Sequence, residues 1–281
     1  MQRFDFFTCG GGQFWEDVFF YQKWRIQRHY KTKEFRLLDP WDIRRYEGGF
    51  EECRQAFLKY ITMYQLPRQK GHMIIMLHGW GDSKNIFKPL WRAALKENYL
   101  AAAVNFPSTQ KDIDGHVRQL DFFLNHLEDV AQVSFVTKGV SSLLLRRLFS
   151  LKTPWQEKLK IGRIVEIAPL NHGSFMLEKM SRSKILDFVI GPMGRGMNPH
   201  KVNKLPPLPK EIESGIIVSE SWMMKLGEVL TNARMEETTL EEEKRTANAK
   251  EVVRIDSHRP NIISDQRVID ATMNFLTTGL F

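Results

Sequence analysis

The chain has 281 residues, 42% of them hydrophobic, and a formal net charge of +8 at pH 7. This apolar content is enough for one large α/β domain, while no apolar run approaches the roughly 20 residues that cross a bilayer. The two cysteines, Cys9 and Cys53, form neither a disulfide framework nor a metal motif. We therefore expect a reducing, cytoplasmic location, no metal and no cofactor, and the start of the chain lacks the apolar core of a signal peptide.

The positive charge does not by itself identify a partner. The lysines and arginines are scattered along the chain, and no RNP, zinc-finger or helix-turn-helix pattern accompanies them. We therefore expect no specific nucleic-acid partner. A peripheral contact with an anionic membrane surface stays open on charge alone, and it would weaken strongly with added salt.

The first seventy residues predict strands followed by a helix. Residues 24–30 and 34–39 are rich in β-branched and aromatic side chains around a polar turn, so we expect two antiparallel strands at an edge of the main sheet. Aromatic and arginine residues alternate here, which is more typical of an edge strand with one packed face than of nucleic-acid stacking. From Phe50 to Pro67 apolar residues recur at helical spacing.

The middle of the chain alternates strands with helices. Residues 72–77 form a continuous apolar run, which predicts a strand buried on both faces, and the glycine-rich turn His78-Gly-Trp-Gly81 follows it. A helix at 87–95, a strand at 99–109 and a helix over 114–131 come next. This alternation predicts a mostly parallel sheet with helices on both faces and binding chemistry at the carboxyl ends of its strands.

A second strand-to-helix break follows at the centre of the sequence. The apolar run 133–137 ends at Lys138-Gly139-Val140, and a helical pattern begins at Ser141. The remaining elements are expected as a strand at 162–169, a Gly/Pro-rich lid-like loop at 191–209, strands at 214–219 and 251–256, and a C-terminal helix. The acidic run 235–244 lies between the last two strands and predicts a solvated loop or helix.

These segments, in this order, resemble the bacterial lipase-like and esterase-like α/β-hydrolases. The turn at Gly139 is similar to the V-x-F-V-T-H-S-x-G-G that carries their nucleophilic serine. The His78-Gly-Trp-Gly81 turn resembles their H-G-x-G loop, whose backbone N–H contributes to the oxyanion hole, and residues 170–174 resemble P-N-x-G-S. The resemblance implies one α/β-hydrolase domain over residues 1–281, with N-terminal edge strands and a helix in 1–71 and the core in 72–281.

The resemblance also implies a degenerate catalytic triad. Gly139 stands at the serine, and Lys138 stands at the histidine before it. His258 stands at the catalytic base, and matching backwards from it puts Met235 at the orienting aspartate, with Glu236 beside it. Glycine has no side chain to attack a carbonyl and methionine cannot stabilise an imidazolium, so His258 is expected as a residual base without partners.

Two functions of different classes remain open. The first is a non-hydrolytic protein that binds a small acyl or anionic ligand, or a protein partner, through the old cleft, where the Lys138 ammonium would favour an anion. The second is an active serine hydrolase of the esterase or lipase type that uses Ser141, His258 and Glu236. We expect Gly139 and His258 to face one cleft at the carboxyl edge of the sheet. Its lining is expected to comprise His78, Gly79, Trp80, Lys138, Gly139, Val140, Asn171 and Met235.

Overall fold

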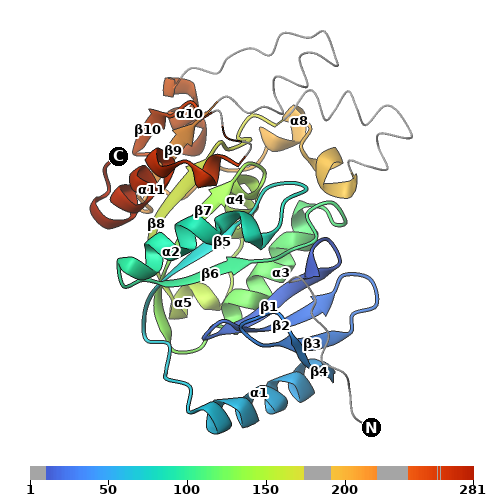
Figure 1. Cartoon of the computed structure of the whole chain (residues 1–281). Helices are drawn as coiled ribbons and strands as arrows, with labels where there is room; N and C mark the ends of the chain where they lie inside the picture. The colour runs from blue at the N-terminus through green and yellow to red at the C-terminus, as the bar shows by residue number, and fades with distance from the viewer. Residues whose placement is uncertain (1–10, 174–190, 220–239, 258, 260) are drawn as a thin grey trace.

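The computed structural model of the chain describes residues 11–173, 191–219, 240–257, 259 and 261–281, and it contains two sheets (Figure 1). A six-stranded sheet has the order β10-β9-β8-β7-β5-β6, with every neighbouring pair parallel. A four-stranded antiparallel sheet has the order β1-β2-β3-β4. Within these described ranges, no helix has both the length and the apolar content needed to span a bilayer.

The strands of the parallel sheet are β5 (Gly71–Leu77), β6 (Leu100–Val104), β7 (Val130–Lys138), β8 (Lys160–Ile167), β9 (Ser214–Val218) and β10 (Glu251–Arg254). Those of the antiparallel sheet are β1 (Trp15–Tyr21), β2 (Trp24–His29), β3 (Phe35–Leu38) and β4 (Arg44–Gly48). The α-helices are α1 (Phe50–Tyr64), α2 (Lys88–Lys96), α3 (Ile113–Asn125), α4 (Ser141–Phe149), α5 (Trp155–Lys158), α8 (Pro199–Val202), α10 (Leu240–Ala247) and α11 (Gln266–Thr278). Two short 3₁₀ helices are η2 (Lys84–Phe87) and η3 (Ile262–Ser264).

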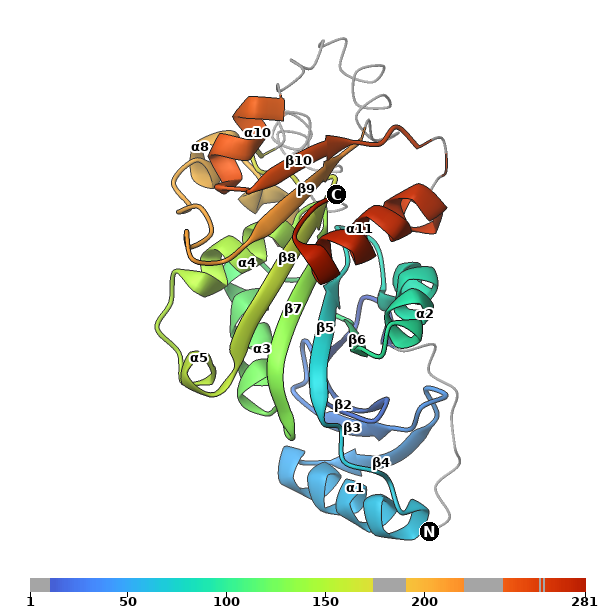
Figure 2. The same ribbon diagram turned by 90° about the vertical axis from the view of Figure 1, so that its left-hand side faces the viewer.

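Helices cover both faces of the parallel sheet, as the alternation of apolar runs and helical patterns predicted (Figure 2). On one face, side chains from α3, α4 and α5 pack with Met73, Ile75 and Leu77 of β5. On the other face, α2 and α11 pack with Ile74 and Met76 of the same strand. Burial on both faces explains why β5 is apolar along its whole second half rather than alternating.

The N-terminal strands are antiparallel, as predicted, and they form a four-stranded sheet of their own rather than extending the parallel sheet. The strands predicted at 24–30 and 34–39 are present as β2 and β3, while β1 and β4 flank them and were not predicted. This small sheet has a separate apolar core with α1, in which Phe19 and Trp24 pack around Phe57. The aromatic side chains therefore serve packing within this unit rather than nucleic-acid stacking.

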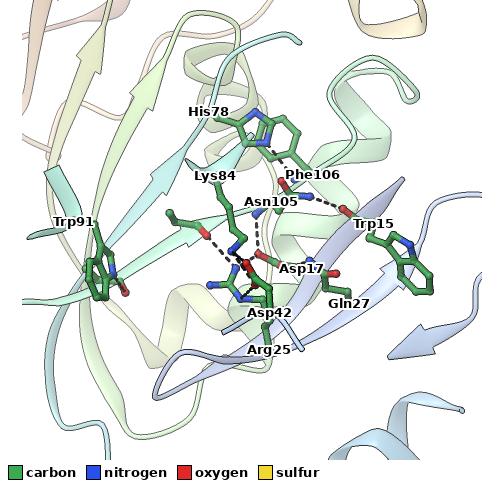
Figure 3. A network of polar contacts seen from close by, with 12 residues as sticks. Trp15, Asp17, Arg25, Gln27, Asp42, His78, Lys84, Trp91, Asn105 and Phe106 are labelled. Atoms are coloured by element: carbon green, nitrogen blue, oxygen red, sulfur yellow. Dashed lines mark hydrogen bonds and ion pairs between the residues drawn. The ribbon is translucent and has the colours of Figure 1, made fainter. Parts of the chain in front are cut away.

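A buried polar network fastens the small sheet to the end of β6 (Figure 3). Asp17 of β1 is 1% exposed, and its backbone N–H donates to the carbonyl oxygen of Asn105 at 2.8 Å. In return, the Asn105 N–H donates to Asp17 Oδ2 at 2.8 Å. Arg25 and Gln27 of β2 also donate to the Asp17 carboxylate, each at 2.7 Å. One carboxylate thus joins two strands of the small sheet to the segment that follows β6.

The Gly/Pro-rich segment differs from the lid-like loop predicted at 191–209. Residues 191–196 are helical and α8 follows them. Met193, Met197, Val202 and Leu208 are buried in the same apolar cluster as α3 and α4. Buried apolar side chains hold this segment against the body of the protein, whereas composition alone suggested a surface crossing. In the acidic run, residues 240–244 begin α10, and residues 235–239 lie outside the described residues.

Candidate functional site

The predicted strand-turn-helix at Gly139 is confirmed. β7 ends at Lys138, α4 begins at Ser141, and Gly139 between them has a φ of +59°. The Gly139 N–H donates to the carbonyl oxygen of Ile167 at 3.0 Å, which fixes the turn beside the end of β8. A positive φ is unfavourable for residues with a side chain, and it is the backbone state of a sharp elbow between a strand and a helix.

Among the described residues, the space where a nucleophile side chain would stand is open. A Cβ atom built on Gly139 would have the carbonyl oxygen of Ala168 as its nearest neighbour, at 3.9 Å, which is ordinary van der Waals contact. The elbow therefore has room for a side chain that this chain does not supply. A ligand atom can approach the Gly139 backbone more closely than it could in a hydrolase with serine at this position.

The charged group beside the elbow is already paired. Lys138 Nζ lies 2.7 Å from Asp82 Oδ2, and the two side chains are 22% and 25% exposed. Sequence reasoning assigned Lys138 to the cleft but did not assign Asp82, although Asp82 directly follows the glycine-rich turn. The ammonium is therefore neutralised by its neighbour, and an incoming anion competes with the Asp82 carboxylate for it.

The glycine-rich turn packs against the elbow, as predicted. A Cβ atom on Gly79 would lie 2.9 Å from Asp82 Oδ2 and 3.3 Å from the carbonyl oxygen of Lys138. Only glycine allows this close approach of the two loops without displacement. The Gly81 N–H donates to Ser108 Oγ at 3.0 Å, so this amide ties the turn to the segment after β6 and is not offered to an oxyanion.

His78 has a structural position rather than the cleft-lining position predicted for it. Its ring is completely buried and stacks on Phe106, with ring centroids 4.0 Å apart. Nδ1–H donates to the carbonyl oxygen of Gly79 at 2.9 Å, and Nε2 accepts from the Phe106 N–H at 3.3 Å. Burial lowers the pKa of His78 to about 4, so the neutral ring joins the ends of β5 and β6 at neutral pH.

Three further residues predicted for the cleft point into the protein. Val140 is buried in the main apolar cluster, and Trp80 is half-buried against the same cluster. Asn171 is completely buried, and its side-chain amide donates to Glu166 Oε2 at 2.9 Å. The resemblance placed these residues at the carboxyl ends of strands and therefore in a cleft. That position does not determine on which face of the sheet a side chain emerges.

Ser141, the alternative nucleophile, is held by the backbone of the elbow. Its Oγ is buried, accepts from the Lys138 N–H at 2.9 Å, and lies 2.7 Å from the carbonyl oxygen of Leu77. The carbonyl oxygen of Lys138 lies at 2.9 Å. A hydroxyl surrounded by these groups stabilises the turn, is buried, and has backbone groups rather than a base as its described partners, which argues against it as a nucleophile.

Three residues of the predicted site lie outside the described residues: His258, Met235 and Glu236. The prediction that His258 faces Gly139 across one cleft, and the alternative acid Glu236, therefore stay predictions. The described part of the site consists of the elbow at Gly139, the Lys138–Asp82 ion pair and the turn at Gly79.

Comparisons with known proteins agree with this architecture. No family model matches the chain. A protein of Mycoplasma pneumoniae, provisionally named esterase/lipase 2, is 27% identical over 132 residues, which are 43% of this chain and 45% of that protein. The chain thus matches less than half the length of this curated relative.

Solved structures with a similar fold include several hydrolases. The mature lipase BlEst2 of Bacillus licheniformis is 14% identical, with a TM-score of 0.54 over 75% of this chain and 94% of that chain. A hydrolase from Oleispira antarctica is 11% identical, with a TM-score of 0.51 over 74% and 92%. A monoacylglycerol lipase from Paleococcus ferrophilus is 11% identical, with a TM-score of 0.50 over 73% and 94%.

The parallel six-stranded sheet, the elbow between β7 and α4 and these similarities define the class. The chain has the α/β-hydrolase fold and resembles lipases and esterases of that fold. At these identities the likeness establishes the fold, and the activity of the similar proteins does not transfer with it.

Proposed function

We propose that this protein does not hydrolyse esters and instead uses the cleft at the elbow to bind a small ligand that has an acyl chain and an anionic head. The observation that carries the proposal is the backbone at Gly139, which keeps the positive φ of an elbow and open space above it but has no side chain. Acyl transfer needs an attacking atom with a base beside it, and the described elbow supplies neither.

The anionic part of the proposal depends on Lys138. Its ammonium is the cation nearest the elbow in the sequence, and it is partly exposed in its ion pair with Asp82. A carboxylate or phosphate can replace Asp82 as the partner of Lys138, while the apolar chain of the ligand would occupy the space above Gly139. A protein segment with an acidic side chain would meet the same chemistry, and it is the alternative occupant of this cleft.

We expect no labelling of the wild-type protein by a fluorophosphonate probe. Such a probe requires an activated serine, and the Ser141 hydroxyl is buried among backbone groups. In-gel fluorescence after incubation with the probe measures this directly, with a known serine esterase as the positive control. Labelling of the wild type that is lost in Ser141→Ala would refute the proposal and establish the serine hydrolase that uses Ser141, His258 and Glu236.

We expect octanoate binding to respond in opposite directions to the two halves of the ion pair. Asp82→Asn leaves Lys138 unpaired and should tighten octanoate binding about fivefold, because a partly exposed pair is worth about 1 kcal/mol at most. Lys138→Ala should weaken it by a similar factor. Titration calorimetry measures both, and octanol is the neutral ligand with the same chain. An unchanged octanoate Kd in Lys138→Ala would remove the anionic head from the proposal.

Location and other partners complete the proposal. A cytoplasmic location is supported by the free, buried thiol of Cys53, whose pKa burial raises to about 12. Such a thiol is inert toward oxidation and metal capture at neutral pH. A peripheral contact with an anionic membrane surface rests on the net charge of +8 alone, and vesicle binding that falls steeply with salt would support it.

A further inference from the structure

Two buried carboxyl groups lie on the face of the parallel sheet below α4 and α10. Glu166 is in the middle of an otherwise apolar part of β8 and is completely buried, while Glu243 of α10 is 8% exposed. Two consecutive residues after β8 link the two carboxyl groups: the Asn171 amide donates to Glu166 Oε2 at 2.9 Å, and His172 Nε2 lies 3.4 Å from Glu243 Oε1. Glu166 Oε1 and Glu243 Oε2 are both buried without a hydrogen-bond partner.

Each element packed against this pair contributes one of the surrounding groups. Thr137 of β7 faces it from the neighbouring strand, and its Oγ1 is buried without a hydrogen bond. His172, after β8, has Nε2 3.4 Å from Glu243 Oε1. Arg146 of α4 is the nearby cation, and Glu242 of α10 is a further carboxylate that acts on His172 and Glu243.

Arg146 does not neutralise the pair by direct contact, because its donors are used elsewhere. Its guanidinium donates to the carbonyl oxygens of Asn171 at 3.1 Å, Leu205 at 2.5 Å and Pro206 at 3.0 Å. Among the described residues, the two carboxyl groups therefore have no hydrogen-bonded counter-charge. Among the described side chains, no set of three or more His, Cys, Asp or Glu residues is arranged to hold a metal, so a bound proton is the simplest source of neutrality.

The pKa values agree with a protonated site. Burial raises the pKa of Glu166 to about 7, against the opposing effects of the Asn171 hydrogen bond and the Arg146 charge. Burial, and then the charge of Glu166, raises the pKa of Glu243 to about 7. Two neighbouring carboxyl groups of this kind lose their protons as a coupled pair.

Among the described residues, α10 makes little apolar contact with the sheet. Its apolar contact is a small cluster in which Ala247 packs with Ile216 and Ala249. The main apolar clusters on the two faces of the sheet contain no residue of α10. With so little buried apolar area, the charge state of Glu243 is a large part of what decides whether α10 stays docked.

We propose that Glu166 and Glu243 form a pH-sensitive latch, which holds α10 on the sheet while the pair keeps a proton and releases α10 when both carboxyl groups are ionised. The latch adjoins the elbow, because Ile167, the residue after Glu166, accepts the hydrogen bond from the Gly139 N–H. Release of α10 would change the surroundings of the candidate cleft, but the latch does not depend on the ligand proposed for that cleft.

The direction of the pH effect follows from the sign of the shifts. An acid whose pKa is higher in the folded protein binds its proton more tightly there than in the open state. Docking is then strongest at and below the ordinary glutamate pKa of 4.5, weakens as pH rises toward about 7, and changes little above that. Alkaline conditions should therefore open α10.

Hydrogen exchange in peptides that cover α10 tests the latch in the full-length protein. After correction for intrinsic exchange, protection of wild-type α10 should fall at least about tenfold between pH 5 and pH 8, since one pKa unit corresponds to a factor of ten. In the double variant Glu166→Gln/Glu243→Gln the fall should be less than about twofold, because both titrating groups are gone, and Glu243→Gln and Glu166→Gln alone should each show a smaller fall than wild type. Glu241→Gln, an exposed position on the same helix, is the matched control and should behave like wild type.

The outcome is decisive even if one substitution prevents folding. A wild-type α10 whose protection does not change with pH would overturn the latch. So would a fall of wild-type size in whichever of Glu243→Gln and Glu166→Gln folds. A fall confined to peptides outside α10 would assign the pH dependence to other groups and would likewise remove the proposal.

Discussion

A Gly139→Ser variant is expected to fold and to hydrolyse p-nitrophenyl acetate only at background rate. The open space above Gly139 accepts the new side chain, while the positive φ costs about 1–3 kcal/mol of stability for a residue other than glycine. A serine hydroxyl at the elbow still needs a base held in the correct orientation. Met235, which the resemblance places at the orienting acid, cannot provide that.

Adding Met235→Asp to Gly139→Ser is expected to raise turnover well above that of the single variant. In the worked serine-protease case, loss of the orienting aspartate costs about 10⁴ in turnover, so its restoration has the same upper bound. Steady-state hydrolysis of short p-nitrophenyl esters measures the gain. Gly139→Ala/Met235→Asp is the matched control, because it has the same backbone strain and the same new carboxylate but no hydroxyl.

One result would contradict the idea that the chain has lost only the nucleophile and the orienting acid. If crystallography places the introduced hydroxyl within hydrogen-bond reach of His258 and hydrolysis still stays at background, the oxyanion hole has decayed as well. One amide of the turn is already used in this way, because the Gly81 N–H donates to Ser108, which follows β6. That outcome would favour a fold long used for binding over a recently silenced hydrolase.

The order of elements in the parallel sheet could be predicted from sequence because periodicity reports burial. The apolar runs of β5 and β7 are buried on both faces. The apolar residues of α3, which lies between these strands in the sequence, recur at helical spacing. The separate N-terminal sheet could not be predicted in this way. β4 is charged and nowhere fully buried, and β1 has Glu16 and Asp17 within it, so neither shows the pattern of a buried strand.

The candidate site was predictable only where backbone geometry depends on residue type. The elbow at Gly139 and the close approach of Gly79 could be found because a positive φ and a close approach of two loops both favour glycine, which breaks the apolar runs visibly. The faces on which His78 and Asn171 emerge depend on packing with distant segments, which no local pattern encodes. Glu166 did give a signal, a single carboxylate within an apolar strand, but its partner Glu243 comes from a distant acidic run that looks solvated.

Asp17→Ala is expected to destabilise the protein by about 3–5 kcal/mol, the usual cost of breaking a buried ion pair by removing one partner. The change leaves Arg25 without its close carboxylate and also removes the acceptor for Gln27 and for the Asn105 N–H (Figure 3). Urea unfolding measures the loss. Asp114→Ala is the matched control, because Asp114 pairs with Arg147 where the side chains are 54% and 37% exposed, and it should cost about 1 kcal/mol or less.

A double variant separates the ion pair from the packing around it. Arg25→Met removes the second buried charge while keeping much of the side-chain volume, so Asp17→Ala/Arg25→Met should be more stable than Asp17→Ala alone. The gain arises because the single variant leaves Arg25, whose side chain is 9% exposed, without its carboxylate at 2.7 Å and with the longer 4.0 Å pair to Asp42. The alternative result is a double variant whose loss of unfolding free energy, relative to wild type, equals the sum of the losses in the two single variants. Arg25 would then contribute through its contacts with Ala103 and Asp42 rather than through Asp17. The small sheet would then be fastened at the turn between β3 and β4, and not through the carboxylate of β1.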